Sequence, residues 1–265
     1  TFNPVILGHE FCAEVVDYGP NTERSVAPGQ LVCAAPVLLR EPMEPVGYSD
    51  KIPGGFAQYM LLSESLIVPV PSGCNADLAA LTEPMAVGLH AVNKAQLSAK
   101  ETILIIGAGP VGLAIITALK QINTGPIIVS DFSPGRRKLA EAIGADIVID
   151  PSDTDPYQEP ALRKREGVVI FECVGIPGMI DQIFLGAPKN AKIMIVGVCL
   201  QQDYIRPLIA INKELSLHFM LGWSMEEFTQ SLRYIAEGKF NVAPLITGRT
   251  SLDGVASTFE SLATP

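Results

Sequence analysis

Cysteine is scarce in this sequence, and its spacing excludes two kinds of protein. The chain of 265 residues has five cysteines, an odd number, and no two of them form a Cys-x-x-Cys pair. A disulfide-stapled secreted domain and a four-cysteine zinc knuckle are therefore both excluded. Scattered, unpaired cysteines are typical of a reducing compartment, so we expect a cytoplasmic protein. The five are Cys12, Cys33, Cys74, Cys173 and Cys199.

Basic charge and long apolar runs are scarce as well. Lys and Arg total 19 against 28 Asp and Glu, which gives a net charge of −9 without any basic run. Nucleic-acid binding needs clustered positive charge, so we expect no nucleic-acid partner. The uncharged stretch Ile103–Leu119 is shorter than the roughly 20 residues of a membrane span, and glycines and a proline interrupt its start. We therefore expect no membrane partner.

What the sequence does contain is a glycine-rich turn between a strand and a helix. The apolar run Ile103–Ile106 predicts a strand, and a helix is predicted over 111–122. A second strand, predicted over 127–130, ends directly on Asp131. The turn carries the G-x-G-x-x-G spacing at Gly107, Gly109 and Gly112. Strand, glycine turn, helix and strand-end acid follow one another as in a dinucleotide-binding site.

Each glycine has a separate task in such a turn. Gly107 allows the tight turn, and Gly109 lets the backbone approach a pyrophosphate. Gly112 lets the helix pack closely on the strand. Pro110 and Val111 begin the helix, whose free N–H groups and positive dipole end would face the phosphates. The pattern predicts a bound dinucleotide.

The strand-end acid indicates which dinucleotide. Asp131 can accept hydrogen bonds from ribose hydroxyls and would repel a 2′-phosphate, which favours NAD over NADP. Arg136 is the counter-argument, since a nearby arginine can serve a 2′-phosphate. We interpret Arg136 as lying beside the adenosine ribose. The alternative for Asp131 is an acid at a helix N-terminus with no ligand.

The rest of the chain divides into a β-rich part and an alternating part. Glycines and prolines separate short predicted strands at 4–7, 11–18, 30–35, 57–62 and 66–70, and 40–55 is predicted to be an exposed polar loop. Strands and helices then alternate, with strands predicted at 103–106, 127–130, 147–150, 168–172, 192–197 and 214–220. This alternation predicts an α/β protein with a parallel, doubly wound sheet. A long helix over 225–238, a last strand and a last helix complete the prediction.

A second group of residues suggests a metal. His9 and Glu10 lie between two predicted strands, and Glu83 precedes an apolar helix. An imidazole nitrogen and carboxylates can hold one zinc ion. The alternative is a structural histidine together with an acid at a helix N-terminus, where the helix dipole favours it.

Taken in order, these motifs resemble those of the zinc-dependent medium-chain alcohol dehydrogenases, most closely the sorbitol, butanediol and threonine dehydrogenase branch. The motifs are Gly8-His9-Glu10, Gly54 to Tyr59, Glu83-Pro84 with His90-Ala91, the turn Gly107 to Gly112, and Asp131. The resemblance implies a partial GroES-like catalytic domain, residues 1–88 and 223–265, and a Rossmann NAD-binding domain, residues 89–222. It also implies one catalytic zinc, held by a cysteine, by His9, and by Glu10 or Glu83.

Several departures from the family pattern have consequences. The family's cysteine ligand and a hydroxyl residue of its proton relay would precede residue 1, so we interpret the sequence as truncated at both ends. Only Cys33 lies in the region of the family's structural zinc lobe, and we predict no structural zinc. Leu221 and Gly222 stand where polyol-specific members carry an arginine, which weakens the case for sorbitol itself.

The resemblance also marks two strand ends for the nicotinamide. Val196 and Val198 flank Gly197 at the end of the fifth predicted strand of the alternating part, where the family's backbone holds the carboxamide. Val174 follows the fourth strand and would border the cofactor. Ligands bind at the carboxyl ends of parallel strands, so topology supports both assignments. The alternative for the Val196 segment is an ordinary buried strand end.

The resemblance implies reversible, NAD-dependent oxidation of a secondary alcohol or polyol to a ketone, with His9, Glu10 and Glu83 at the catalytic centre. Two alternatives are a zinc-free enone or quinone reductase of the same fold and a non-catalytic nucleotide-binding protein. The family implies a homodimer or a homotetramer, and the sixth predicted strand, as a sheet edge, could pair across such an interface.

Overall fold

The computed structural model describes residues 5–122, 124–163 and 167–262. The chain forms two compact units, one made of Thr1–Pro84 with Ser224–Pro265 and the other of Met85–Trp223. The functional division at residues 88 and 222 stays a prediction. None of the helices that the described residues form is long and apolar enough to cross a bilayer.

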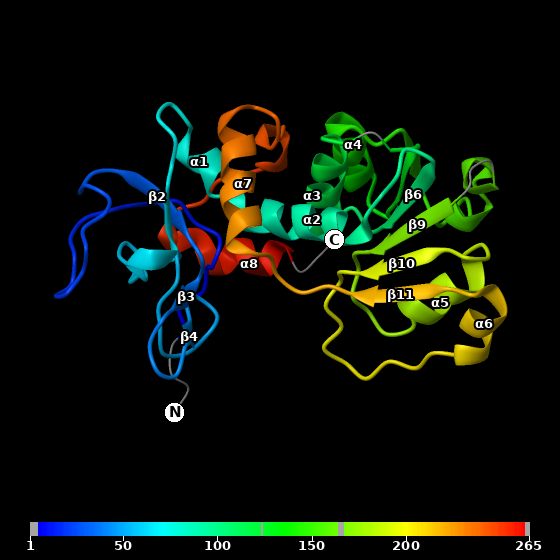
Figure 1. The fold of residues 1–265 in the computed structure, drawn as a ribbon, viewed down its shortest axis with the longest axis horizontal. Coiled ribbons are helices and arrows are strands. Elements are labelled where there is room, and N and C mark those ends of the chain that lie inside the picture. The colour runs from blue at the N-terminus through cyan, green and yellow to red at the C-terminus, as the bar shows by residue number, and fades with distance from the viewer. Residues whose placement is uncertain (1–4, 123, 164–166, 263–265) are drawn as a thin grey trace. The chain divides into compact units, whose positions relative to one another are not determined.

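The second unit contains the predicted parallel sheet. Its six strands follow the order β11-β10-β9-β6-β7-β8, and every neighbouring pair is parallel (Figure 1). The strand order reverses beside β6, the first strand of this sheet in the sequence, as in a doubly wound fold. The strands are β6 (Glu101–Ile106), β7 (Ile127–Ser130), β8 (Ile147–Ile149), β9 (Gly167–Glu172), β10 (Lys192–Ile195) and β11 (Ser216–Phe219).

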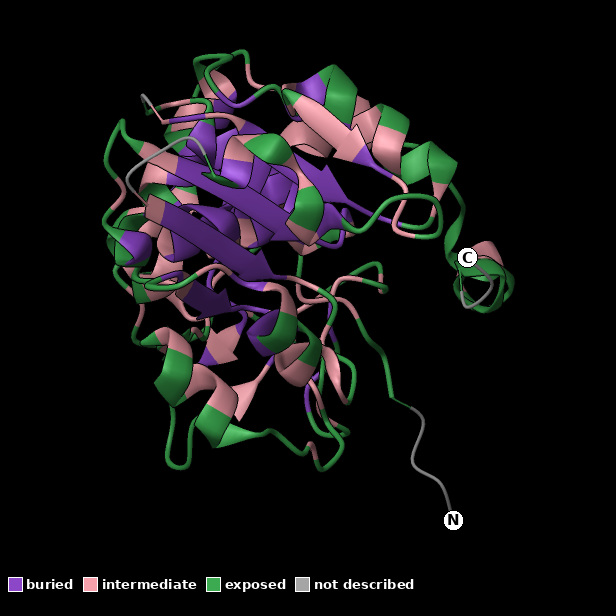
Figure 2. Ribbon diagram, turned by 90° about the vertical axis from the view of Figure 1, so that its right-hand side faces the viewer, coloured by how far each residue is buried: buried purple, intermediate pink, exposed green. Residues whose placement is uncertain are grey.

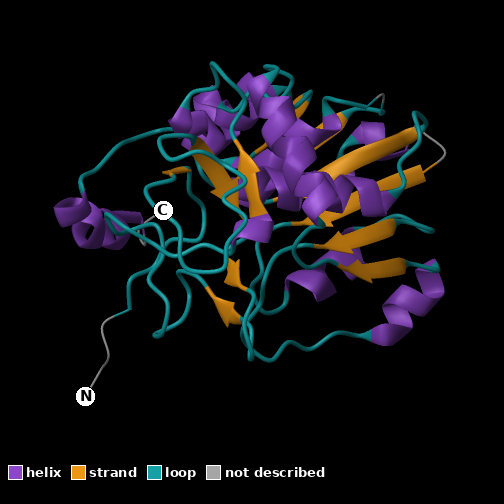
Figure 3. Ribbon diagram, turned by 60° about the vertical axis from the view of Figure 1, so that its left-hand side comes forward, coloured by secondary structure: helices purple, strands orange, loops and turns teal. Residues whose placement is uncertain are grey.

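Helices cover both faces of this sheet (Figure 3). Helix α3 (Pro110–Leu119) contacts α4 (Pro134–Ile143), and α5 (Met179–Gly186) contacts α6 (Pro207–Lys213). Two short 3-10 helices, η2 (Pro156–Gln158) and η3 (Pro160–Arg163), precede β9. The doubly wound α/β architecture predicted from the alternating pattern is confirmed.

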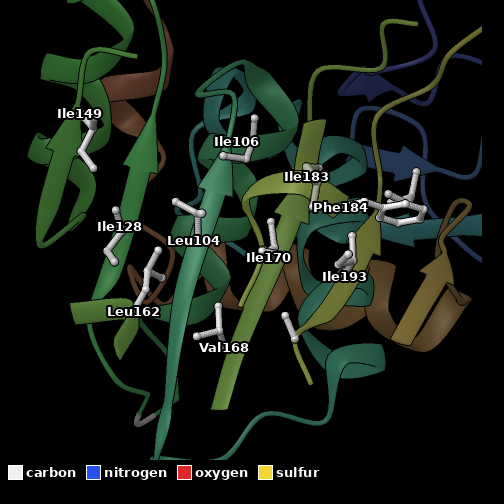
Figure 4. Packing of buried hydrophobic residues seen from close by; sticks show 13 residues of the cluster. Leu104, Ile106, Ile128, Ile149, Leu162, Val168, Ile170, Ile183, Phe184 and Ile193 are labelled. Carbon is white, nitrogen blue, oxygen red and sulfur yellow. The ribbon is translucent and has the colours of Figure 1, made fainter. Parts of the chain in front are cut away.

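The core of this unit explains the apolar runs of the sequence. Successive residues of a strand point to opposite faces, so Leu104 and Ile106 lie on one face of β6 and Ile103 and Ile105 on the other. All four are buried, because helices cover both faces. Figure 4 shows Leu104 and Ile106 in a cluster with side chains from neighbouring strands and from α5. Figure 2 shows the central strands almost wholly buried.

The first unit is built from shorter elements. Its antiparallel sheet has the order β1-β2-β5, and β3 pairs with β4 in a hairpin. Helix α1 contacts α7, and α2 begins in this unit and continues into the other. The elements are β1 (Ala13–Glu14), β2 (Leu31–Ala34), β3 (Val37–Leu38), β4 (Glu44–Pro45), η1 (Glu64–Leu66), β5 (Ile67–Pro69), α1 (Ala76–Ala79), α2 (Thr82–Ala95), α7 (Met225–Ala236), η4 (Ala243–Leu245), η5 (Leu252–Gly254) and α8 (Val255–Leu262).

Some predictions for this unit were wrong. Among the described residues, neither 5–7 nor 57–62 forms a strand, and no strand lies between α7 and α8; Pro4 is outside the described residues. A strand needs a backbone partner as well as a suitable pattern. Here the carbonyls of Ile6 and Leu7 accept hydrogen bonds from the N–H groups of Gly54 and Phe56, which form a loop contact and not a ladder.

The segment 40–55 is also more ordered than predicted. It contains β4 and contributes Val46 and Ile52, which are buried with Leu38 in a small apolar cluster. Val46 and Ile52 stand among glycines and prolines and give no periodic pattern, so the sequence predicted an exposed loop for this segment. The cluster fixes the loop that lies against the segment before His9.

Candidate functional site

Three predicted site residues meet in the first unit. A nitrogen of His9 and one carboxylate oxygen each of Glu10 and Glu83 lie within 4.8 Å of one another. His9 and Glu10 come from the segment before β1, whereas Glu83 lies in the first turn of α2. The structure thus brings a carboxylate beside a histidine that is distant in sequence.

Glycines hold the segment before His9 in place. Gly8 has a φ of +102°, a conformation that other residues rarely adopt. A Cβ atom on Gly47 would lie 2.1 Å from the carbonyl oxygen of Gly8, and one on Gly54 would lie 2.2 Å from it. Three chain segments therefore approach so closely that only glycine fits. The His9 ring packs edge-on against Tyr48, with ring centroids 5.3 Å apart.

The electrostatics of this group suit a cation. The pKa of Glu10 is raised, first by burial and then by the neighbouring Glu83 carboxylate, while His9 lowers it. Two carboxylates in a partly buried site repel each other unless a positive charge lies between them. One imidazole nitrogen and two carboxylates are ligands that zinc accepts. The residues present therefore fit a divalent metal.

The second unit holds the glycine turn. Gly107 has a φ of +96°, and a Cβ atom there would lie 2.8 Å from the Val174 side chain. A Cβ atom on Gly112 would lie 2.0 Å from the Gly107 carbonyl oxygen, so the helix touches the turn. At Gly109 no atom lies within 4 Å of a Cβ position. The surroundings of the three glycines therefore suit their predicted tasks. Gly107 turns the chain, Gly109 leaves room for a ligand, and Gly112 lets the helix pack closely.

The start of α3 is open to an anion. Gly109 is its N-cap and supplies no side-chain cap, and Pro110 occupies the first turn with Val111 next. The first N–H groups of the helix are therefore available to a phosphate. Gly88 of α2 was not singled out from the sequence, but a Cβ atom there would lie 2.5 Å from the Ala114 backbone. This close helix–helix approach fixes α3 from its other side.

Asp131 ties the two turns of this site together. Only 8% of the residue is exposed, and one carboxylate oxygen accepts a hydrogen bond from the Ala108 N–H at 2.7 Å. The other oxygen accepts from the Ser133 N–H at 2.8 Å. Arg136 places a guanidinium nitrogen 3.9 Å from the carboxylate, with half of its side chain exposed. Asp131 and Arg136 therefore lie together beside the glycine turn.

Two strand-end turns adjoin the glycine turn. Val174 and Val198 are exposed at 38% and 69%, whereas Val196 is buried. A Cβ atom on Gly175 would lie 2.6 Å from the Val198 nitrogen, so the turns after β9 and β10 touch each other. Val174, Val198 and Gly107 thus gather at the carboxyl edge of the sheet.

Sequence reasoning missed the residue that builds these turns. Glu172 ends β9 and is 2% exposed. One of its carboxylate oxygens accepts hydrogen bonds from the N–H groups of Val174 at 2.7 Å and Gly175 at 2.8 Å. A Cβ atom on Gly197 would lie 2.6 Å from its other oxygen. The available signal was an acid at the end of an otherwise apolar strand, directly before a cysteine and a second glycine-containing turn.

Comparison with known proteins identifies similar chains. A family model described as "Alcohol dehydrogenase GroES-like domain" matches residues 1–72, and one described as "Zinc-binding dehydrogenase" matches residues 110–237. The chain is 33% identical to (R,R)-butanediol dehydrogenase of Bacillus subtilis, over 94% of this chain and 75% of the relative. It is 28% identical to sorbitol dehydrogenase of the same organism, over 97% of this chain and 77% of the relative.

Solved structures show the same likeness. The crystal structure of 2R,3R-butanediol dehydrogenase from Bacillus subtilis matches with a TM-score of 0.85 and 31% identity, covering 98% of this chain and 78% of that one. Galactitol-1-phosphate dehydrogenase from Escherichia coli matches with a TM-score of 0.87 and 25% identity, covering 99% of this chain and 82% of that one.

Proposed function

The chain belongs to the zinc-binding, medium-chain alcohol dehydrogenase family and interconverts alcohols and ketones; we propose that NAD is its cofactor and that a secondary alcohol or polyol is its substrate. The named activities of its relatives, on butanediol and on sorbitol, support this substrate class. Both compounds carry a secondary hydroxyl next to another hydroxyl. The GroES-like fold and the doubly wound sheet are those of the family.

The metal part of the proposal depends on the cluster in the first unit. His9 would supply an imidazole nitrogen, and Glu10 or Glu83 a carboxylate oxygen, to one catalytic zinc. Bound zinc would act as a Lewis acid that lowers the pKa of the substrate hydroxyl. The glycine contacts around Gly8 would keep His9 in position, and Tyr48 would limit its ring orientation. We propose no structural zinc for this chain.

The cofactor part depends on the second unit. The N-terminus of α3, with Gly107, Gly109, Pro110, Val111 and Gly112, would bind the pyrophosphate. Asp131 would accept from the adenosine ribose, with Arg136 beside it. Val174, Val196 and Val198 would line the nicotinamide, held in place by Glu172. The cofactor would then supply the hydride chemistry, and the protein its orientation.

A paired subunit is also proposed, as a homodimer or a homotetramer. Strand β11 is an edge of the sheet, and no strand of the described residues pairs with its outer side. Phe219 on this strand is 71% exposed, and Leu221 just after it is 88% exposed. Pairing of two β11 strands about a two-fold axis would cover both side chains and extend the sheet.

The observation that carries the metal proposal is the convergence of His9, Glu10 and Glu83. We expect about one zinc per chain in the whole protein, counted by elemental analysis of metal-replete samples. His9→Ala should remove most of it, because the site loses its only nitrogen donor among the three. His218→Ala, on β11, is the matched control and should keep the zinc. A zinc-free unmutated protein would overturn the metal assignment.

Turnover tests the substrate class separately. Butane-2,3-diol, sorbitol and L-threonine should be compared as substrates with NAD, following the NADH absorbance. We expect activity on at least one secondary alcohol and a parallel loss of activity and zinc in Glu83→Ala. Glu14→Ala is the control, because Glu14 is an exposed carboxylate of β1 outside the cluster. Full zinc content and full turnover in Glu83→Ala would remove Glu83 from the site.

A further inference from the structure

Two cysteines of the first unit lie opposite each other. Strands β1 and β2 are antiparallel, with Ala13 opposite Val32 and Glu14 opposite Leu31. Continuing this register by one residue sets Cys12 opposite Cys33. Residues directly opposite in a sheet point to the same face. Ala13 and Val32 belong to the apolar cluster on one face, so Cys12 and Cys33 lie on the other.

The pair has a spacing that suits a disulfide. The backbone of Val15 bonds to the facing chain through both groups, its N–H to the Gln30 carbonyl at 3.0 Å and its carbonyl to the Gly29 N–H at 2.8 Å. Along an antiparallel strand, residues bonded in this way alternate with residues that are not, so Cys12, three residues before Val15, forms a non-hydrogen-bonded pair with Cys33. The Cα atoms of such a pair are ~4.5 Å apart, within the ~4.4–6.8 Å range of disulfides. The two thiols are also close enough for each to shift the pKa of the other.

We propose that Cys12 and Cys33 form a reversible disulfide, and thus a thiol redox site that is separate from the alcohol dehydrogenase reaction. The oxidant would be a small disulfide of the glutathione class. The Cys12 sulfur attacks one of its sulfurs and releases one small thiol. The Cys33 sulfur then attacks the Cys12 sulfur and releases the second. Two protein S–H bonds and one small disulfide become one protein disulfide and two small thiols.

Exposure sets the order of these two attacks. Cys12 is partly exposed and lines a surface cavity of ≈ 520 Å³ beside β1. Cys33 is 0% exposed, so an external disulfide reaches Cys12 first. The pKa of Cys33 is raised, first by the neighbouring Cys12 thiol and then by burial, which also makes it the second thiol to react. Cys12 is therefore the entry point, and Cys33 closes the bridge.

The bridge would join two segments that hold the metal cluster. Cys12 follows Glu10 by two residues in the chain. The Cys33 thiol donates to the Ala79 carbonyl at 3.2 Å and accepts from the Thr82 hydroxyl at 3.8 Å, directly before Glu83. Disulfide formation removes the Cys33 S–H and with it the bond to Ala79. We expect the oxidised form to hold zinc less tightly, an expectation that rests on the proposed function.

The test is a thiol count and a peptide map of the whole protein after incubation with oxidised glutathione. We expect a loss of two free thiols per chain and a peptide pair joined through Cys12 and Cys33. Dithiothreitol should restore both thiols. Neither readout depends on zinc or on turnover, so failure of the metal proposal would leave this result intact.

Cys74 is the competing partner and provides the matched control. It is a cysteine of the same unit, and the pKa of its thiol is raised by burial and then by the Cys12 thiol. Cys74→Ser should keep the bridge, whereas Cys12→Ser should lose it. Cys33→Ser should leave Cys12 as a stable mixed disulfide with glutathione. A Cys12–Cys74 bridge in the unmutated protein, or a mixed disulfide at Cys12 with no bridge, would overturn the proposal.

Discussion

At the residue scale, the Asp131 carboxylate accepts hydrogen bonds from backbone N–H groups without a bound cofactor. Each of its oxygens already accepts one N–H group, from Ala108 and from Ser133, so the side chain is held in a single orientation. A carboxylate oxygen can accept more than one hydrogen bond, and the remaining capacity is available to ribose hydroxyls. The same residue thus fixes the glycine turn and would select the cofactor.

Asp131→Asn separates these two tasks. The amide can replace only one of the two acceptors and carries no charge to repel a 2′-phosphate. We expect kcat/KM for NAD to fall about 10- to 100-fold, as for one hydrogen bond to a charged group worth ~1.5–3 kcal/mol. The value for NADP should fall less. The measurement is the ratio of the two values, because turn distortion lowers both together.

Asp150→Asn is the control for that ratio. Asp150 follows β8 and pairs with Arg137 at 2.7 Å, so it is a neighbouring acid outside the glycine turn. Its replacement should leave the preference for NAD unchanged. An equal loss with NAD and NADP in Asp131→Asn would show that Asp131 shapes the turn without selecting the cofactor.

On the scale of a single element, α3 depends on glycines with opposite surroundings. Gly112 lies against the Gly107 carbonyl, whereas nothing lies within 4 Å of a Cβ position on Gly109. Alanine in a helix interior normally stabilises relative to glycine by ~0.5–1 kcal/mol. A loss of stability in Gly112→Ala would therefore measure the close contact with the Gly107 carbonyl, because helix propensity alone would favour alanine.

The two alanine variants should therefore behave differently. Gly112→Ala should lower Tm by several degrees, because the overpacked turn costs ~1–3 kcal/mol. Gly109→Ala should keep Tm, since its φ of −72° suits alanine and its Cβ meets no atom. It should nevertheless weaken NADH binding, because the methyl group would occupy the place of the pyrophosphate. Thermal unfolding without cofactor and a fluorescence titration with NADH measure the two effects; unchanged NADH affinity in Gly109→Ala would contradict the assigned binding site.

On the scale of the whole molecule, the proposed pairing of subunits depends on the exposed edge strand β11. An unpaired edge with apolar side chains promotes association, and a charge placed there opposes it. We expect Leu221→Asp to convert the oligomer to a smaller species, because two aspartates would face each other across the two-fold axis. Light scattering coupled to size-exclusion chromatography gives the mass. Met43→Asp, a change at a residue 66% exposed in the other unit, should leave the mass unchanged.

The result at β11 also distinguishes two forms of assembly. A dimer that dissociates to monomers indicates that β11 is its one interface. A tetramer that falls to a dimer indicates a second interface elsewhere on the subunit. A wild-type monomer at micromolar concentration would contradict the proposed pairing.

The sequence by itself determined most of the second unit. Each of the six strands lies within two residues of its predicted bounds. For the central strands the reason is that a strand covered on both faces is a continuous apolar run, which is a local signature. The glycine spacing likewise determined the turn, since Gly107 requires a positive φ and Gly112 a close contact, and both requirements act on the backbone nearby. The sequence was therefore sufficient for strands and turns whose conformation depends on residues that are close together in the chain.

Only the tertiary structure decided which residues that are distant in sequence contact one another. The segment 57–62 has strand-forming residues but no ladder partner among the described residues, and therefore forms no strand. Glu83 reaches His9, Glu172 builds two turns, and Cys12 faces Cys33 only because the chain folds these segments together. Such contacts depend on packing and backbone pairing between remote residues, for which a periodic sequence pattern carries no information.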